Sequence, residues 1–202
     1  MGLWLGGFSM KKLVGLLVML VGACTAPARI DQMVGQFSTP ALAETDARYQ
    51  SVRIARADVD PKAHPVWYTS ISNESLSGAV RATLDGRGLF ALYPGNAKME
   101  MDVQLVDFRR PPAKLDEATT VSIRYVVRDV STGGKVFDQT ITTVGTAPFE
   151  KNVPSDQRTR AAAEQAMAEN MAQFINKFMA ATGQPQAQPQ APQPKKPKAK
   201  QQ

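Results

Sequence analysis

The sequence predicts an α+β domain in which a four-stranded mixed sheet carries two helices on one face, in the order β-α-β-β-β-α. Two observations carry this prediction: stretches of strict apolar–polar alternation, and two stretches with apolar residues at helical spacing. The chain of 202 residues is 43% hydrophobic, which suits one globular domain with appendages. A helix between the first two strands makes them parallel through a right-handed crossover, and the later strands form an antiparallel meander.

The first two strands differ in how clearly the sequence marks them. The stretch YQSVRIARADV, residues 49–59, is the weaker, with Val52 and Ile54 as its apolar pair. The stretch KMEMDVQLVDF, residues 98–108, alternates Met99, Met101, Val103 and Leu105 with polar residues, as a half-buried strand does.

The third and fourth strands form a hairpin. The stretch TTVSIRYVVRDV, residues 119–130, places Val121, Ile123, Tyr125 and Val127 on one face. The residues STGG that follow supply a turn near residue 133, and KVFDQTITTV continues as the partner strand.

The two helices are marked by caps, stops and apolar spacing. The first begins at Ser72 or Asn73, continues through Leu76, Val80 and Leu84, and ends at the glycines 86 and 88. The second is capped by Ser155 and extends to about Ala181. Its apolar stripe consists of Met167, Met171, Phe174, Ile175 and Phe178. That stripe either packs on the domain's own sheet or forms a groove for a partner.

The chain divides into four regions. Residues 1–23 form a signal peptide, 24–47 a tether with little regular structure, and 48–182 the folded domain. Residues 183–202, with the stretch QPQAQPQAPQPKKPKAKQQ, are predicted to be a disordered tail because they lack large apolar residues.

The net charge of +6 belongs to the ends of the chain. Six of its 24 basic residues lie there, two lysines before residue 24 and four after residue 183, which leaves 18 basic against 18 acidic residues between them. A nucleic-acid-binding fold needs a basic face of its own. The neutral body therefore argues against a nucleic-acid partner.

The N-terminus has the form of a secretory signal. Met10 is followed by two lysines and then by a short apolar run, LVGLLVML, which is too short to cross a bilayer. Residues upstream of Met10 would place the lysines in the middle of a longer span, at a high energetic cost. We therefore expect Met10 to be the true start.

The run ends in Val21-Gly22-Ala23-Cys24, which resembles the lipobox of bacterial lipoproteins. The resemblance implies cleavage between Ala23 and Cys24 and covalent lipid on the thiol of Cys24, with no other cofactor. The acyl chains anchor the protein to a membrane. Thr25 stands where an aspartate resembles an inner-membrane retention signal, so the resemblance implies an outer-membrane protein that faces the periplasm.

The order of elements behind the lipobox is similar to that of small outer-membrane lipoproteins. The likeness is carried by SLSGAVRATLDGRGLF, MEMDVQLVDF, VSIRYVVRDVSTGGKVFDQTI and AENMAQFINKFM. It resembles the lipopolysaccharide-assembly (LptE-like) lipoproteins, the YajG-like lipoproteins and the auxiliary lipoproteins of lipid-exporting transporters. The body departs from the assembly family in being charge-balanced, where that family often presents basic residues.

No pattern in the sequence indicates catalysis. His64 is the single histidine and no GxSxG-like elbow accompanies it, and one cysteine with one histidine argues against a classical zinc site. Asp102 and Asp107 are five residues apart on one strand, a spacing that predicts opposite faces. We therefore expect a non-enzymatic protein without a metal site.

Two short segments are candidate partner contacts. Trp67 and Tyr68, in HPVWYTSIS, either pack over the sheet edge or form an exposed aromatic patch. Arg109 and Arg110 form the one short basic cluster of the body, or else a solvated loop.

The expected function is that of a lipid-anchored accessory or assembly factor. It would bind an outer-membrane or periplasmic protein, in lipopolysaccharide or lipid transport, with lipid or peptidoglycan as a further contact. A tethered periplasmic ligand-binding domain and an activator of cell-wall synthesis are the alternatives.

Overall fold

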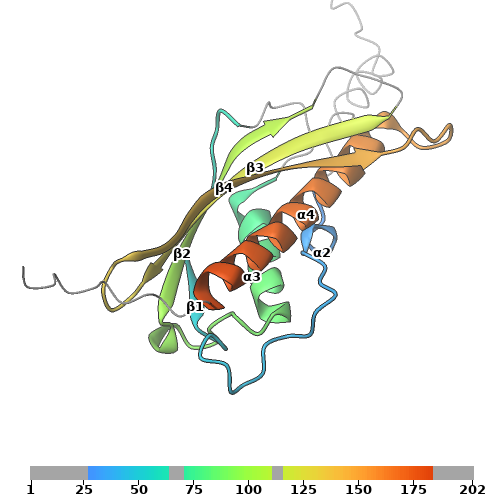
Figure 1. Ribbon diagram of the computed structural model, residues 1–202. Helices are drawn as coiled ribbons and strands as arrows, with labels where there is room; N and C mark the ends of the chain where they lie inside the picture. The colour runs from blue at the N-terminus through green and yellow to red at the C-terminus, as the bar shows by residue number, and fades with distance from the viewer. Residues whose placement is uncertain (1–26, 64–70, 111–115, 184–202) are drawn as a thin grey trace, which may run out of the picture.

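The computed structural model describes residues 27–63, 71–110 and 116–183, and Figure 1 shows their arrangement. Its elements, in chain order, are α2 (Ile30–Met33), β1 (Val52–Val59), α3 (Asn73–Gly86), the short 3-10 helix η2 (Pro94–Asn96), β2 (Met99–Arg109), β3 (Glu117–Asp129), β4 (Lys135–Ala147) and α4 (Ser155–Gly183). Among the described residues, no helix is long and apolar enough to span a bilayer.

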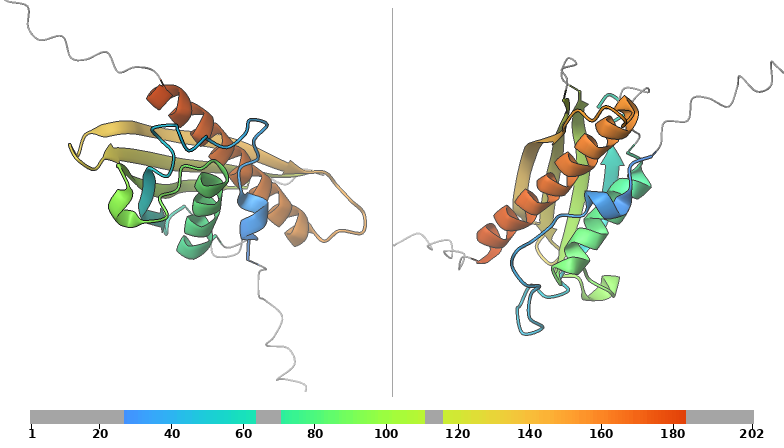
Figure 2. Two further views of the ribbon diagram at one scale, coloured as in Figure 1. Left: turned by 90° about the horizontal axis from the view of Figure 1, so that it is seen from below. Right: turned by 90° about the vertical axis from the view of Figure 1, so that its right-hand side faces the viewer.

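The four strands form one sheet in the spatial order β1-β2-β3-β4. Strands β1 and β2 pair in parallel, whereas the β2–β3 and β3–β4 pairs are antiparallel. Helices α3 and α4 lie on the same face of this sheet, as two views show (Figures 1 and 2). The predicted α+β class and mixed sheet are confirmed.

The core lies between that face and the helices. Met101, Val103 and Leu105 of β2 are at most 1% exposed, as the alternation predicts. The alternating residues of β3 that face the same way are also fully buried: Val121, Ile123, Tyr125 and Val127.

Helix α3 begins and ends where the sequence indicates. Ser72 is its N-cap and accepts a hydrogen bond from the backbone N–H of Ser75, whose hydroxyl in turn accepts one from the N–H of Ser72. The helix ends before Gly88, which has a φ of +71° that a residue with a side chain rarely adopts.

Helix α4 has 29 residues and is therefore about 43 Å long. Its apolar stripe packs on the domain's own sheet, the first of the two alternatives. The ring of Phe174 stacks on that of Tyr125 with centroids 4.2 Å apart, and Phe137 of β4 meets Phe174 edge-on at 5.5 Å.

Strand β2 contains a β-bulge between Leu105 and Asp107. The extra residue shifts the alternation by one, so that Phe108 becomes the next buried residue after Leu105. Asp107 pairs with Ser122 and Asp102 with Val126, so both aspartates lie on the outer face. The expectation that they occupy opposite faces is wrong for this reason.

Residues 27–47 contain only the short helix α2 as regular secondary structure, and parts of this segment are packed against the domain. Met33 of α2 is fully buried, and the backbone N–H of Gly35 donates to Thr83 Oγ1 in α3 at 3.1 Å. The guanidinium of Arg87 donates to the carbonyls of Thr39 and Pro40 at 2.7 and 2.6 Å. We call residues 28–42 the strap.

Candidate functional site

The lipidation site and the aromatic candidates lie outside the described residues. This applies to Ala23 and Cys24 and to the 64–70 segment with His64, Trp67 and Tyr68. The residues that flank that segment, Ala63 and Ile71, are 6% and 3% exposed. The roles predicted for these residues remain predictions.

The strap brings the folded body close to Cys24. Ala28 is 6% exposed, and the backbone N–H and guanidinium of Arg29 donate three hydrogen bonds to the carboxylate of Glu164 at 2.9–3.2 Å. Glu164 is 4% exposed and projects from α4. Four residue steps separate Cys24 from Ala28, which span at most about 14 Å of extended chain.

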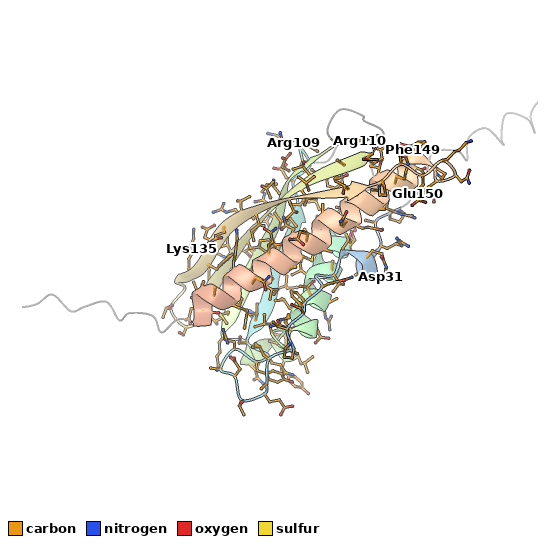
Figure 3. The ribbon with its side chains drawn as sticks, turned by 45° about the vertical axis from the view of Figure 1, so that its right-hand side comes forward. Asp31, Arg109, Arg110, Lys135, Phe149 and Glu150 are labelled. Carbon is orange, nitrogen blue, oxygen red and sulfur yellow. The ribbon has the colours of Figure 1, made fainter. Side chains whose placement is uncertain are left out.

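Arg109 and Arg110, both labelled in Figure 3, are neighbours in sequence but make different ion pairs. Arg109 is 73% exposed in its side chain and pairs with Asp107 at 2.7 Å. Arg110 pairs with Glu117, which is 6% exposed in its side chain, at 2.5 Å. Arg110 therefore helps to hold the start of β3, whereas Arg109 forms a surface ion pair.

The larger of the described clefts lies along the outer edge of β1. It has a volume of about 780 Å³ and lies between β1, α3 and the segment that leads into η2. Residues 53–57 line one side, and Asn73, Glu74, Ser77 and Arg81 of α3 line another. Phe90 closes one end and is half-buried.

Arginines dominate the charge of this cleft. Arg53, Arg56 and Arg81 line it, against Glu74 as the single carboxylate in the lining. The first two are paired on the outer face with Glu100 and Asp58. Arg81 lies over the ring of Phe90, 4.8 Å from its centroid, and within the described residues it has no carboxylate partner.

Sequence reasoning missed this site. Leu92 and Tyr93, 55% and 69% exposed, follow Phe90 in the stretch LFALYP, which has neither helical nor strand periodicity. Exposed aromatic and leucine residues between two glycine-containing turns are the signal that could have marked it. The sequence of α3 gives no comparable signal for its side of the cleft, because an arginine such as Arg81 is common on the solvent-exposed face of a helix.

The outer face of the sheet, opposite the helices, is covered by paired charges. Arg128 bonds Asp102 at 2.5 Å, and Asp138 accepts hydrogen bonds from Arg124 at 3.1 Å and Lys135 at 2.7 Å. These hydrogen bonds lower the pKa of Asp138 to about 2. The described residues contain no group of three or more His, Cys, Asp or Glu side chains placed to hold a metal ion. The charges on this face are matched in pairs.

A second described cleft, of about 580 Å³, lies between the strap and α4. Glu164, Glu169 and Arg29 line it together with alanines and glutamines. Glu164 and Arg29 are bonded to each other, and Glu169 accepts a hydrogen bond from Gln173. The β1 cleft is therefore the better candidate for a binding site.

No model of a known protein family matches the sequence, and no curated protein matches it. Solved structures do resemble it. A DUF330-family protein from Xanthomonas campestris shares 14% identity, with a TM-score of 0.52 over 74% of this chain and 92% of that one. A minor lipoprotein from Acinetobacter baumannii shares 16% identity, with a TM-score of 0.43 over 70% of this chain and 98% of that one. The chain thus has the fold of the Xanthomonas protein.

Proposed function

We propose that this chain is a lipid-anchored envelope lipoprotein whose domain acts as a non-enzymatic accessory or assembly factor. The lipid is attached to Cys24, and the domain faces the periplasm from the outer membrane. It binds a protein of the outer membrane or periplasm, and the process it serves is lipopolysaccharide or lipid transport.

One observation carries the proposal: the folded body begins within four residues of the predicted lipid-bearing cysteine. Because Ala28 is buried and Arg29 is bonded to Glu164, the domain stays within about 14 Å of its attachment point. A short connection keeps the domain at the membrane surface and raises its effective concentration toward membrane-bound partners. That arrangement suits a protein whose role is to hold or position another.

The C-terminal tail leaves the domain far from the anchor. Helix α4 meets the strap at Glu164 and ends at Gly183, 19 residues later, which corresponds to about 28 Å along the helix. A basic Pro/Gln-rich tail that starts there could contact an anionic polymer such as peptidoglycan. Deleting residues 184–202 should then reduce sedimentation of the protein with cell-wall sacculi.

Replacing the thiol tests the anchor. In the Cys24→Ser variant we expect loss of metabolic labelling by a fatty acid and loss of the processed membrane-bound form, because the chain has no other cysteine. The Thr25→Ser variant is the matched control and should label normally. Labelling of the Cys24→Ser variant would contradict the proposal.

A tethered periplasmic ligand-binding domain is the second candidate, favoured by the arginine-lined cleft of about 780 Å³. In-cell crosslinking followed by mass spectrometry separates the two. Reproducible crosslinks to one envelope protein support the accessory role. Their absence, together with a small anionic molecule retained through native purification, favours the ligand-binding role.

A further inference from the structure

The outer edge of β1 already accepts one piece of extended chain. The backbone N–H of Val52 donates to the carbonyl of Leu89 at 2.9 Å, and the N–H of Ala91 donates to the carbonyl of Val52 at 2.8 Å. Phe90 thereby forms a parallel β-bridge with Val52. After Ala91 the chain turns away into η2, so the pairing covers the first residue of the strand and stops.

Farther along β1, the described residues provide no partner strand for the same edge. Backbone groups of alternate residues point to the same side of a strand, so those of Ile54 point away from β2, as those of Val52 do. After the β-bulge next to Ile54, the edge is fixed again at Val59, whose N–H donates to Asn73 Oδ1 at 2.8 Å. By the same alternation the backbone N–H and C=O of Ala57 also point away from β2. In the described part of the chain, the backbone groups of Ile54 and Ala57 have no hydrogen-bond partner on that side.

The cleft lies between the two positions where the edge of β1 is already bonded, the bridge from Val52 to Phe90 and the hydrogen bond from Val59 to Asn73. It contains the open stretch from Ile54 to Ala57, with the half-buried Phe90 at one end and the first turn of α3 at the other. An unpaired strand edge is a template for an added strand, whose backbone bonds supply affinity while side-chain pockets supply specificity.

We propose that an extended, acidic segment of a protein partner adds to the edge of β1 as a fifth strand. This inference rests on the proposed function in one respect, that the partner is a protein. Glutamate or aspartate side chains on one face of the added strand reach Arg53 and Arg56, and those on the other reach Arg81. Apolar side chains between them pack on Ile54 and Phe90.

Charge also argues against a second copy of this chain as the occupant. Antiparallel pairing of two β1 edges would bring Arg53 and Arg56 of both copies together, and like charges facing each other across strands are destabilising. Arg81, which has no carboxylate partner among the described residues, attracts a carboxylate-bearing strand instead. The edge of β1 therefore favours binding of an acidic segment over pairing with the β1 edge of a second copy of this chain.

Peptide titration of the unlipidated mature chain, residues 24–202, tests the proposal. The probe is the blocked six-residue peptide Glu-Glu-Val-Val-Glu-Glu, which as an extended strand carries glutamates on both faces with a valine between them, and amide chemical shifts report where it binds. We expect saturable shifts centred on Ile54 and Ala57. A peptide with lysine in place of glutamate, and an acidic one with proline in place of valine, should bind at least tenfold more weakly.

Two variants of equal charge change decide whether the effect is local. Arg81→Glu should weaken binding of the acidic peptide about tenfold, because it reverses a charge inside the cleft. Lys177→Glu reverses an exposed charge on α4, outside the cleft, and should leave binding unchanged. Equal losses in both variants, shifts away from β1, or no shift at millimolar peptide would each overturn the inference.

A photo-crosslinking residue at Ala55 separates this inference from the proposed function. Ala55 is exposed in the cleft, and Thr140 is exposed on the opposite edge strand, β4. Crosslinks to an envelope protein from position 55 support both proposals. Crosslinks to such a protein from position 140 alone would overturn the strand-addition inference and leave the accessory role standing.

Discussion

The hydroxyl of Tyr125 donates a hydrogen bond to Oδ1 of Asn170 at 2.9 Å in the middle of the core. Both residues are fully buried, and burial raises the pKa of the Tyr125 hydroxyl so that it remains a donor. The amide nitrogen of Asn170 donates to the carbonyl of Ile141 at 2.8 Å and to Thr143 Oγ1 at 3.1 Å. One side chain of α4 thus joins β3 to β4 and fixes the helix over both strands.

Truncating Asn170 should therefore cost more than removing the tyrosine hydroxyl. Asn170→Ala removes the acceptor of the buried Tyr125 hydroxyl and the donor to Ile141 and Thr143, and we expect a loss of about 3 kcal/mol in unfolding free energy, against about 1 kcal/mol for Tyr125→Phe. In the double variant the two losses should fall short of their sum, because they share one hydrogen bond. Urea denaturation followed by circular dichroism measures all three. Asn176→Ala, at an exposed position of the same helix, is the control, and strictly additive losses would contradict the coupling.

Gly145 sets how closely β4 approaches α4. A Cβ at this position would lie 2.5 Å from the backbone nitrogen of Ala166 and even closer to the carbonyl oxygen of Ala162. Both obstacles are backbone atoms of a helix, so they cannot rotate aside. Gly145→Ala should lower the unfolding free energy by about 3 kcal/mol, through displacement of α4 from the sheet.

Gly95→Ala is the matched control, because a Cβ there meets nothing within 4 Å. The two variants are compared by thermal and urea denaturation. If Gly145→Ala were as stable as Gly95→Ala, the close approach of β4 and α4 would not be a constraint on the fold.

Much of the fold could be predicted because its signals are local. Alternation marks β2 and β3, and the four-residue spacing of Leu76, Val80 and Leu84 marks α3. The bulge in β2 could not be foreseen, because one inserted residue changes which face Asp107 occupies without changing composition. The packing of the strap is equally hidden, since the bond from Arg29 to Glu164 joins residues 135 positions apart.

The candidate functional residues also divide into those that a local sequence pattern identifies and those that only tertiary structure brings together. Cys24 is identified by a contiguous motif, whereas the β1 cleft depends on tertiary structure. It exists because the chain returns at Phe90 to pair with Val52 and because α3 stands beside the strand. Neither the pairing of Phe90 with Val52 nor the position of α3 can be recognised from the residue types at Ile54 and Ala57.

The strap should loosen when its carboxylate anchor is neutralised. Glu164→Gln keeps the shape of the side chain but removes the charge that holds the guanidinium of Arg29. Trypsin should then cleave after Arg29 several-fold faster, because that bond becomes accessible through local opening. Mass spectrometry of timed digests measures the rate. Glu169→Gln, an exposed residue of the same helix, should leave it unchanged, and equal rates in both variants would show that Glu164 does not secure the strap.

Glu117 should make the attachment of α4 sensitive to acid. Burial opposes ionisation of this carboxyl, but hydrogen bonds from Ser155 and Arg110, with the charges of Arg110 and Arg158, lower its pKa below the ordinary 4.5. Because the folded pKa is the lower one, the stabilisation is complete above pH 4.5 and is lost as the pH falls from there through the folded pKa.

Glu117→Gln should remove that part of the pH dependence. At pH 7 we expect a loss of about 2 kcal/mol in unfolding free energy, since hydrogen bonds to a charged group are replaced by weaker ones. Toward pH 3 the difference between the variant and the parent chain should shrink, because protonation has already removed the charge in the parent. Urea denaturation at pH 7, 5, 4 and 3 measures the difference, with Glu150→Gln as the exposed control. A gap that stayed constant across this range would show that the ionised carboxylate of Glu117 does not hold Ser155 and Arg110 to the start of β3.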